Sequence, residues 1–233
     1  DHRILAIKRS WKYHKYVKNR KKLKPEWYPA SQLDVGDYLA YPIPKETKNI
    51  DVLDLSIFVK SRDFDNEYIW EKKRTHSSKK VKRFIKLSDA VLQLCGYYIA
   101  EGCTGHNGIV LHFNQKETNY IKDVRETIKK HFGIDTKIVK SGKVIKISCY
   151  SKIIKEFFSR FGTNAHKKNL PSIFMYLPIK KQKEIIKGMW RGDGCKRKKD
   201  FCYVTHSKKL SQQLKLLLLR QGIVPRMEFR SKD

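Results

Sequence analysis

Residues 94–102 read Leu-Cys-Gly-Tyr-Tyr-Ile-Ala-Glu-Gly, and residues 186–194 read Ile-Lys-Gly-Met-Trp-Arg-Gly-Asp-Gly. Both stretches carry Gly at the third position, a small residue at the seventh, a carboxylate at the eighth and Gly at the ninth. The two carboxylates, Glu101 and Asp193, stand 92 residues apart. A pattern that recurs at such an offset predicts a duplicated unit, with one acid from each copy.

The small residues in each stretch are four positions apart, Gly96 with Ala100 and Gly188 with Gly192. Residues four apart share one face of a helix, and two faces without large side chains approach backbone to backbone. Glycine inside a helix costs about 1 kcal/mol relative to alanine, so a packing role explains its presence. We therefore expect a helix–helix interface that brings the two acids together at one end.

Two carboxylates held close together repel each other unless a cation or a proton lies between them. Oxygen ligands of this kind suit hard divalent ions such as Mg²⁺, with phosphate oxygens and water completing the shell. A metal ion there would support phosphodiester hydrolysis. A single acid followed by glycine is more commonly a solvated helix end, but a matched pair favours a metal-dependent active site.

The composition favours a polyanionic partner. The chain of 233 residues has 52 Lys and Arg against 23 Asp and Glu, a formal charge of +29. Nucleic acid and an anionic membrane surface are the two candidates. The membrane is the weaker one, because no stretch approaches the roughly 20 apolar residues that span a bilayer and no secretory leader is expected.

The five cysteines are odd in number and show no CxxC spacing. We therefore expect no disulfide framework and a reducing, intracellular (cytoplasmic) compartment. Cys195, Cys202 and His206 are conceivable zinc ligands, but their spacing matches no common zinc pattern and a fourth ligand is not evident.

From residue 87 onward, helical and strand-like periods alternate in the order helix, strand, helix, two strands, helix. Ser88 is a candidate N-cap, and Gly133 and Gly222 are candidate stop signals. The second copy repeats the beginning of this order and breaks off near residue 230, so an α+β fold with an incomplete second copy is expected. The expected helices are 89–100, 118–132, 152–161, 182–191 and 208–219, and the expected strands are 108–114, 136–139, 144–149 and 201–205.

Residues 1–86 lack this regular alternation of helical and strand-like periods. Residues 8–24 hold nine Lys or Arg and no acid, with three aromatic residues between them; both a DNA-contacting excursion and a solvated loop fit this pattern. Val35-Gly36-Asp37 predicts a tight turn before a short strand at 38–41. The expected division is a mainly β segment 1–55, a basic linker 56–86, a first copy 87–181 and a second copy 182–233.

Residues 87–230, with both acidic motifs and the helix after each, resemble the LAGLIDADG homing endonucleases, specifically the dodecapeptide type encoded within inteins. The resemblance implies a pseudo-twofold duplicated αββαββα fold with antiparallel saddle-shaped sheets on DNA. It implies a monomer that cuts both strands of a long DNA site and leaves short 3′ overhangs. Glu101 and Asp193 would be catalytic and would bind Mg²⁺ or Mn²⁺, with Gly102 and Gly194 also at the metal. A prokaryotic or archaeal source is expected.

Two further segments resemble parts of inteins. Lys168-Asn169-Leu170-Pro171 resembles a block whose lysine assists the chemistry, which makes Lys168 the third catalytic candidate and Lys167 its register alternative. Residues 1–5 resemble a splicing block that contains His2. The chain shows neither an upstream nucleophile nor a terminal His-Asn pair, so we do not expect it to splice by itself.

On alternating strands one face is buried and the other is free to contact DNA, since a β-ribbon fits the major groove. The expected DNA contacts are His112, Asn114, Lys137, Lys143, Lys146 and Ser148 in the first copy and Lys196, Arg197, Tyr203, Thr205, Arg226 and Arg230 in the second.

Other functions are also compatible with the sequence. An alternative is a DNA-binding protein on this scaffold that has lost cleavage and serves as a regulator or an RNA-splicing helper. A fragment of a splicing intein and a basic RNA-binding module are further alternatives.

Overall fold

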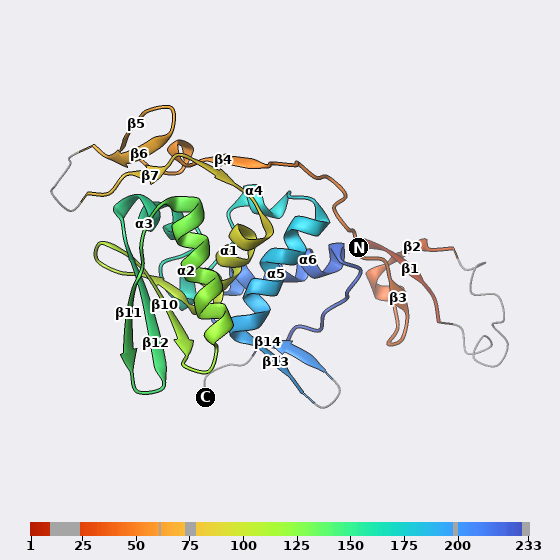
Figure 1. Cartoon of the computed structure of the whole chain (residues 1–233). Helices are drawn as coiled ribbons and strands as arrows, with labels where there is room; N and C mark the ends of the chain where they lie inside the picture. Colours follow the sequence, from red (N-terminus) through yellow and green to blue (C-terminus); the bar gives the residue numbers. More distant parts are fainter. Residues whose placement is uncertain (10–23, 61, 73–77, 198–199, 230–233) are drawn as a thin grey trace. The chain divides into compact units, whose positions relative to one another are not determined.

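The computed structural model describes residues 1–9, 24–60, 62–72, 78–197 and 200–229 (Figure 1). The chain forms two compact units, Asp1–Pro44 and Lys45–Asp233. Most of the basic, aromatic stretch 8–24 and the expected DNA contact Arg230 lie outside the described residues. None of the helices in the described ranges has both the length and the apolar character that crossing a membrane requires.

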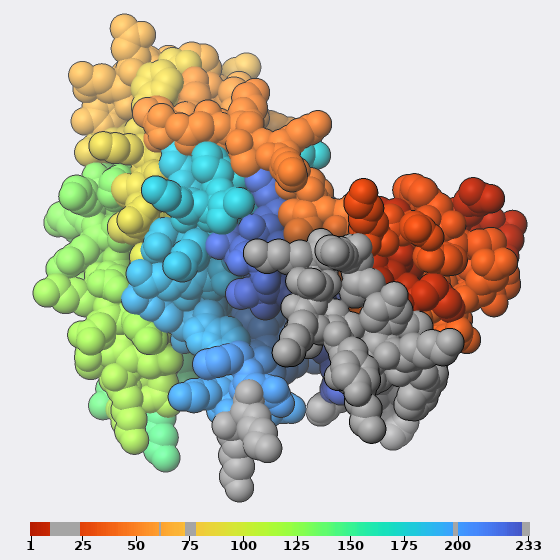
Figure 2. All heavy atoms as spheres, turned by 90° about the vertical axis from the view of Figure 1, so that its right-hand side faces the viewer, coloured from red at the N-terminus to blue at the C-terminus, as the bar shows by residue number. Residues whose placement is uncertain are grey.

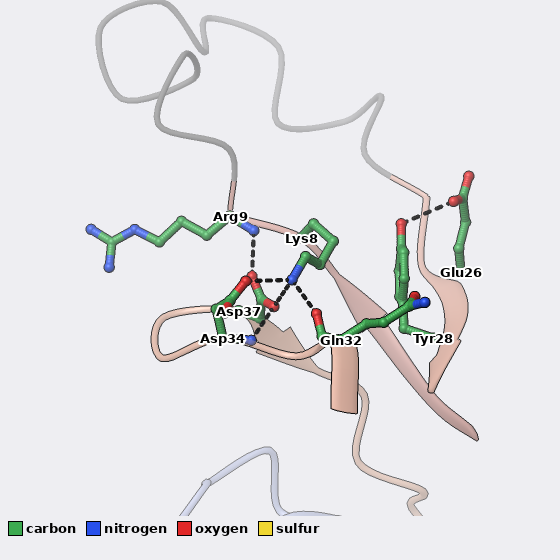
Figure 3. A network of polar contacts seen from close by, with 7 residues as sticks. All are labelled: Lys8, Arg9, Glu26, Tyr28, Gln32, Asp34 and Asp37. Atoms are coloured by element: carbon green, nitrogen blue, oxygen red, sulfur yellow. Dashed lines mark hydrogen bonds and ion pairs between the residues drawn. The ribbon is translucent and has the colours of Figure 1, made fainter. Parts of the chain in front are cut away.

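The first unit is a small antiparallel sheet of order β2-β1-β3. Its turn at Gly36, where φ is +106°, confirms the predicted Val35-Gly36-Asp37 turn. Asp37 is the centre of this turn, because it accepts hydrogen bonds from the backbone N–H of Asp34 at 2.9 Å and from Lys8 Nζ at 2.8 Å (Figure 3). These bonds, with that of the Arg9 N–H, lower the pKa of Asp37 to about 2. The elements are β1 Arg3–Ile7, β2 Glu26–Pro29, η3 Ala30–Gln32 and β3 Tyr38–Leu39.

The described residues between 45 and 87 form small sheets within the second unit, which differs from the basic linker expected at 56–86. Two small antiparallel sheets, β4-β8 and β5-β6-β7, bury Leu53, Ile69 and Ile85. The boundary between units falls after Pro44, not after residue 55. Strands this short leave no periodic signal, so their buried residues were not recognisable in the sequence. The elements are β4 Val52–Asp54, η4 Leu55–Ile57, β5 Arg62–Phe64, β6 Tyr68–Glu71, β7 Val81–Lys82 and β8 Phe84–Lys86.

The first repeat contains the complete expected order of elements. Its four-stranded sheet has the order β11-β12-β10-β9, and α1 and α3 pack against β10. The predicted strand 108–114 and helix 118–132 are confirmed, with Gly133 ending the helix at φ +74°. Strand β9 was not predicted, because it has three residues and follows the acid directly. The elements are α1 Asp89–Glu101, β9 Gly102–Thr104, β10 Gly108–Asn114, α2 Thr118–Phe132, β11 Lys137–Ser141, β12 Val144–Tyr150 and α3 Lys152–Ser159.

The second repeat begins in the same way and carries a smaller sheet. Strands β13 and β14 form a two-stranded hairpin, and residues 221–229, after α6, form neither helix nor strand. The expectation of no disulfide was wrong for one pair, since Cys195 and Cys202 face each other across the hairpin and are bonded. Cys95, Cys103 and Cys149 are free thiols. The connecting elements are η5 Ala165–Lys167 and α4 Ser172–Met175, followed by α5 Ile179–Asp193, β13 Gly194–Lys196, β14 Phe201–Tyr203 and α6 Lys208–Arg220.

The two repeats meet along α1 and α5, and their surfaces lie side by side in the space-filling view (Figure 2). A Cβ on Gly96 would overlap the carbonyl oxygen of Ile185 and would lie 2.8 Å from the Gly188 Cα. A Cβ on Gly192 would lie 2.5 Å from the Ala100 Cβ. The predicted small-residue contact is therefore present, and the molecule is an α+β protein built on a duplicated helix pair.

Candidate active site

The close approach of α1 and α5 brings their C-terminal acids together. Glu101 is the last residue of α1 and Asp193 the last of α5, and a glycine follows each as the C-cap. A Cβ on Gly192 would lie 3.1 Å from Glu101 Oε1, so the final turn of α5 rests against the Glu101 carboxylate. Burial, followed by the negative charge of Asp193, raises the pKa of Glu101 to about 7.

Lys168 reaches this site from the segment between the repeats. It is only 4% exposed, and its Nζ donates to the carbonyl oxygens of Tyr98 at 2.5 Å and Gly102 at 2.6 Å. The ammonium thus binds the negative end of the α1 dipole. Burial lowers the pKa of Lys168 to about 8, against the opposing effect of the acids. Lys167, the register alternative, is exposed.

Asp193 has different neighbours from Glu101. It is the more exposed of the two acids, and the Tyr203 hydroxyl lies 3.4 Å from its Oδ2. Partial loss of solvent raises the pKa of Asp193, while Tyr203, Lys168 and His206 act to lower it. Tyr203, which the sequence predicts to contact DNA, is a hydrogen-bond partner of Asp193 in the structure.

Arg191 was not identified from the sequence, although it stands inside the second motif. Its Nη1 donates to Gln93 Oε1 at 2.9 Å and to the Tyr97 hydroxyl at 2.8 Å, both on α1. Gln93 in turn donates to Glu184 Oε2 of α5 at 2.5 Å. This polar chain crosses the helix interface two residues before Asp193. The sequence pattern does not indicate it, because the hydrogen bonds join residues of two different helices.

The oxygen-only donor set fits a hard divalent cation. Two carboxylates converge, and Mg²⁺ is typically held by one or two carboxylates with phosphate oxygens and water. Within the described residues, no group of three or more His, Cys, Asp or Glu is arranged to hold a metal. This also disfavours zinc at His206, whose two proposed partner cysteines form the disulfide. The Gly102 carbonyl, expected at the metal, accepts a hydrogen bond from Lys168.

The first-repeat sheet presents a polar face opposite its buried face. Ile109, Leu111 and Ile147 are at most 1% exposed and point to the core. His112 pairs with Lys146, and Lys137 pairs with Ser148, so these four share the other face by register. Ser148 is buried and is not available for contact. Asn114, Lys137, Lys143 and Lys146 are exposed and His112 is half-buried.

The second-repeat candidates are more scattered. Lys196 ends β13 and Arg197 follows it, both exposed at the described end of the hairpin. Thr205 accepts a hydrogen bond from the Ser207 N–H at 3.1 Å. Arg226 is exposed and pairs with Glu228 at 3.3 Å. The structure therefore groups the first-repeat candidates on one sheet and leaves these residues on separate segments.

Comparisons with known proteins give the family. A model described as a LAGLIDADG-like domain matches residues 89–162 and 180–232. The protein MJ0043 of Methanocaldococcus jannaschii is 32% identical over 214 residues, covering 89% of this chain and 25% of that protein. The ATP-dependent DNA helicase Hel308 of Thermococcus kodakarensis is 25% identical over 223 residues, covering 85% of this chain and 19% of the helicase.

Among solved structures, the crystal structure of I-DmoI in complex with DNA and Mn aligns with a TM-score of 0.49 and 17% identity. It covers 63% of this chain and 85% of that chain. The chain spans about a quarter or less of the length of these two curated relatives. The relative from M. jannaschii is consistent with the expected archaeal or prokaryotic source. The family model covers more than half of the chain, including both acidic motifs and the helix after each. The chain belongs to the LAGLIDADG-like domain family.

Proposed function

We propose that this chain is a site-specific endonuclease that cuts both strands of duplex DNA with the help of a divalent cation. One observation carries the proposal: Glu101 and Asp193 converge at the ends of two matched helices, beside the buried ammonium of Lys168. Because one chain supplies both acids, a monomer is sufficient. The formal charge of +29 suits a long DNA partner.

In the proposed mechanism Glu101 and Asp193 would hold Mg²⁺ or Mn²⁺, and the Gly102 and Gly194 backbones would contribute to the same site. When bound, the cation would lower the pKa of water and stabilise the charge on the phosphate. Lys168 is fixed by two carbonyl oxygens and presents its positive charge to the same space. We assign it to stabilising the negative charge that develops on the phosphate in the transition state.

Recognition is assigned to the polar face of the first-repeat sheet, with His112, Asn114, Lys137 and Lys146 in the groove and Lys143 at the turn. Arg197, Thr205 and Arg226 would contribute from the second repeat. Many of these cations would contact phosphate, which positions the protein without reading sequence.

We further propose that the chain is of the intein-encoded type, with the unit Asp1–Pro44 as a remnant of a splicing domain. The support is that nearly the whole chain corresponds to a fifth of a protein whose name describes a helicase. A segment that occurs inside a protein with a different main activity behaves as a portable insertion. The separate compactness of Asp1–Pro44 agrees with this division.

The test is cleavage of a supercoiled plasmid library that carries randomised duplex inserts, with Mg²⁺ and with EDTA, followed by sequencing of the cut ends. We expect linear product only with the metal, and ends that share one site and carry short 3′ overhangs. Glu101→Gln protein is the matched control for contaminating nucleases. Specific binding of a selected duplex without cutting would instead support the regulator function.

A further inference from the structure

Two histidines lie on the Asp193 side of the site and have no role in the mechanism above. The rings of His166 and His206 have centroids 5.2 Å apart, inclined at 47°. Both side chains are exposed. His166 belongs to η5, which precedes Lys168, and His206 lies between β14 and α6. Segments 40 residues apart in the chain therefore present two imidazoles together at the surface.

The backbones that carry these rings are held firmly. The Ser207 hydroxyl donates to the Lys168 carbonyl oxygen at 2.6 Å, which ties the two segments together. Ser207 also caps α6, accepting from the Leu210 N–H at 3.2 Å. On the other segment, Asn164 Oδ1 accepts from the Lys167 N–H at 3.2 Å. The pair is thus positioned by the same segment that delivers Lys168 to the active site.

The two histidines are associated with the surroundings of Asp193 rather than with those of Glu101. Tyr203, three residues before His206, pairs with Gly194 across the hairpin and directs its hydroxyl to Asp193. His206 is among the groups that lower the pKa of Asp193, whereas the neighbours that influence the pKa of Glu101 are Asp193, Glu117 and Lys168. A basic group specific to one acid means that the two halves of the site are not equivalent.

We infer that His166 and His206 contact a phosphate oxygen of the DNA strand that is cut on the Asp193 side. This inference rests on the proposed endonuclease function and assigns a ligand to part of the same site. Imidazole N–H groups donate hydrogen bonds to phosphate. Within the described residues the two rings form no group of three metal ligands.

A binding experiment in EDTA tests the contact without any cleavage. The selected duplex carries one neutral methylphosphonate at the scissile position, placed in each strand in turn. We expect the modification in one strand to weaken wild-type binding about tenfold, as for the loss of a hydrogen bond to a charged group. His166→Ala/His206→Ala protein should lose most of this sensitivity and bind the modified and unmodified duplexes with affinities within about threefold of each other. If it is as sensitive to the modification as wild type, the inference is overturned.

A cleavage experiment separates this role from a structural one. His206→Ala should slow the cutting of one strand about tenfold and leave the other within about twofold, so nicked plasmid accumulates. His206→Lys, which keeps an N–H donor, should restore the second cut. Lys180→Ala is the control, because it removes a cation at the other end of α5, about 20 Å from Asp193. It should change the cutting rate of neither strand. Equal slowing of both strands would refute the contact, whereas a wild-type protein that never cuts would refute only the endonuclease function.

Discussion

The two repeats share one helical framework but differ in what surrounds it. The first repeat carries a four-stranded sheet, and strands β6, β7 and β8 pack on its helices α2 and α3. The Lys60 N–H also donates to Glu156 of α3 at 2.8 Å. The second repeat carries a two-stranded hairpin closed by the Cys195–Cys202 disulfide. The two acids stand at the helix ends, so they remain paired while the sheets differ.

The two acids also differ in their exposure and in their neighbours. Glu101 is half-buried with its pKa raised to about 7, and the carbonyl of the next residue binds Lys168. Asp193 is exposed, with Tyr203 and His206 beside it. Different surroundings assign different roles to two chemically similar groups. The duplication therefore supplies the pair, and the neighbours of each acid make the halves distinct.

The largest effect is expected from removing one of the two paired acids, Glu101 or Asp193. Glu101→Gln or Asp193→Asn removes one charge that would hold the cation, a loss of about 4 kcal/mol in transition-state stabilisation or about 1,000-fold in rate. The rate of conversion of supercoiled to linear plasmid measures this, and gel-shift affinity should stay within about threefold. Wild-type linearisation by either variant would remove that acid from the site.

The next effect tests whether both repeats depend on the shared interface. A Cβ on Gly188 would overlap the Gln93 carbonyl oxygen, so Gly188→Ala forces the helices apart. We expect a loss of about 3 kcal/mol in the free energy of unfolding, measured by urea denaturation. Gly105→Ala is the control, since its Cβ would meet Val110 Cγ2 at an ordinary 3.6 Å. Equal stability of the two variants would contradict the close packing.

A smaller effect compares the DNA-reading surfaces. Lys146→Ala lies on the four-stranded sheet and should weaken DNA binding about tenfold, whereas Arg197→Ala on the hairpin should weaken it less than about threefold. Affinities at fixed salt concentration provide the comparison, with Lys180→Ala as a charge-matched control. The reverse order would show that the second repeat dominates recognition.

The smallest effect concerns the segment 45–87. Asp54 accepts from Arg83 Nη2 at 2.7 Å, and this contact lowers the pKa of Asp54 to about 2. A folded-state pKa below the unfolded value of 3.8 means that its stabilisation is complete above pH 3.8 and is lost as the pH falls through 2.

Asp54→Asn should therefore lower the free energy of unfolding by about 1 kcal/mol at pH 7. Denaturation of both proteins across this pH range measures the difference, which should shrink toward pH 2. Asp63→Asn, exposed on β5, should leave stability unchanged at both pH values. A difference that persists at pH 2 would assign the Asp54 effect to another cause.

Much of the repeat framework was predictable because its signals are local. Glycine at positive φ ends α2 at Gly133, and Ser207 caps α6 through its own hydroxyl. Helices of 13 to 15 residues also present several turns of periodic burial. The sheets of segment 45–87 and strand β9 were missed, since strands of two to four residues offer too few positions to show a period.

By itself the sequence determined the duplication, the small-residue faces of the two helices, the acids that follow them and the excess of positive charge. Each is encoded within a few residues or in composition. Only the tertiary structure decided that Lys168, rather than Lys167, is buried at the α1 terminus, that Tyr203 bonds Asp193, and that the two acids differ in exposure. Burial and hydrogen bonding at these positions depend on partners distant in the chain, which the local pattern does not specify.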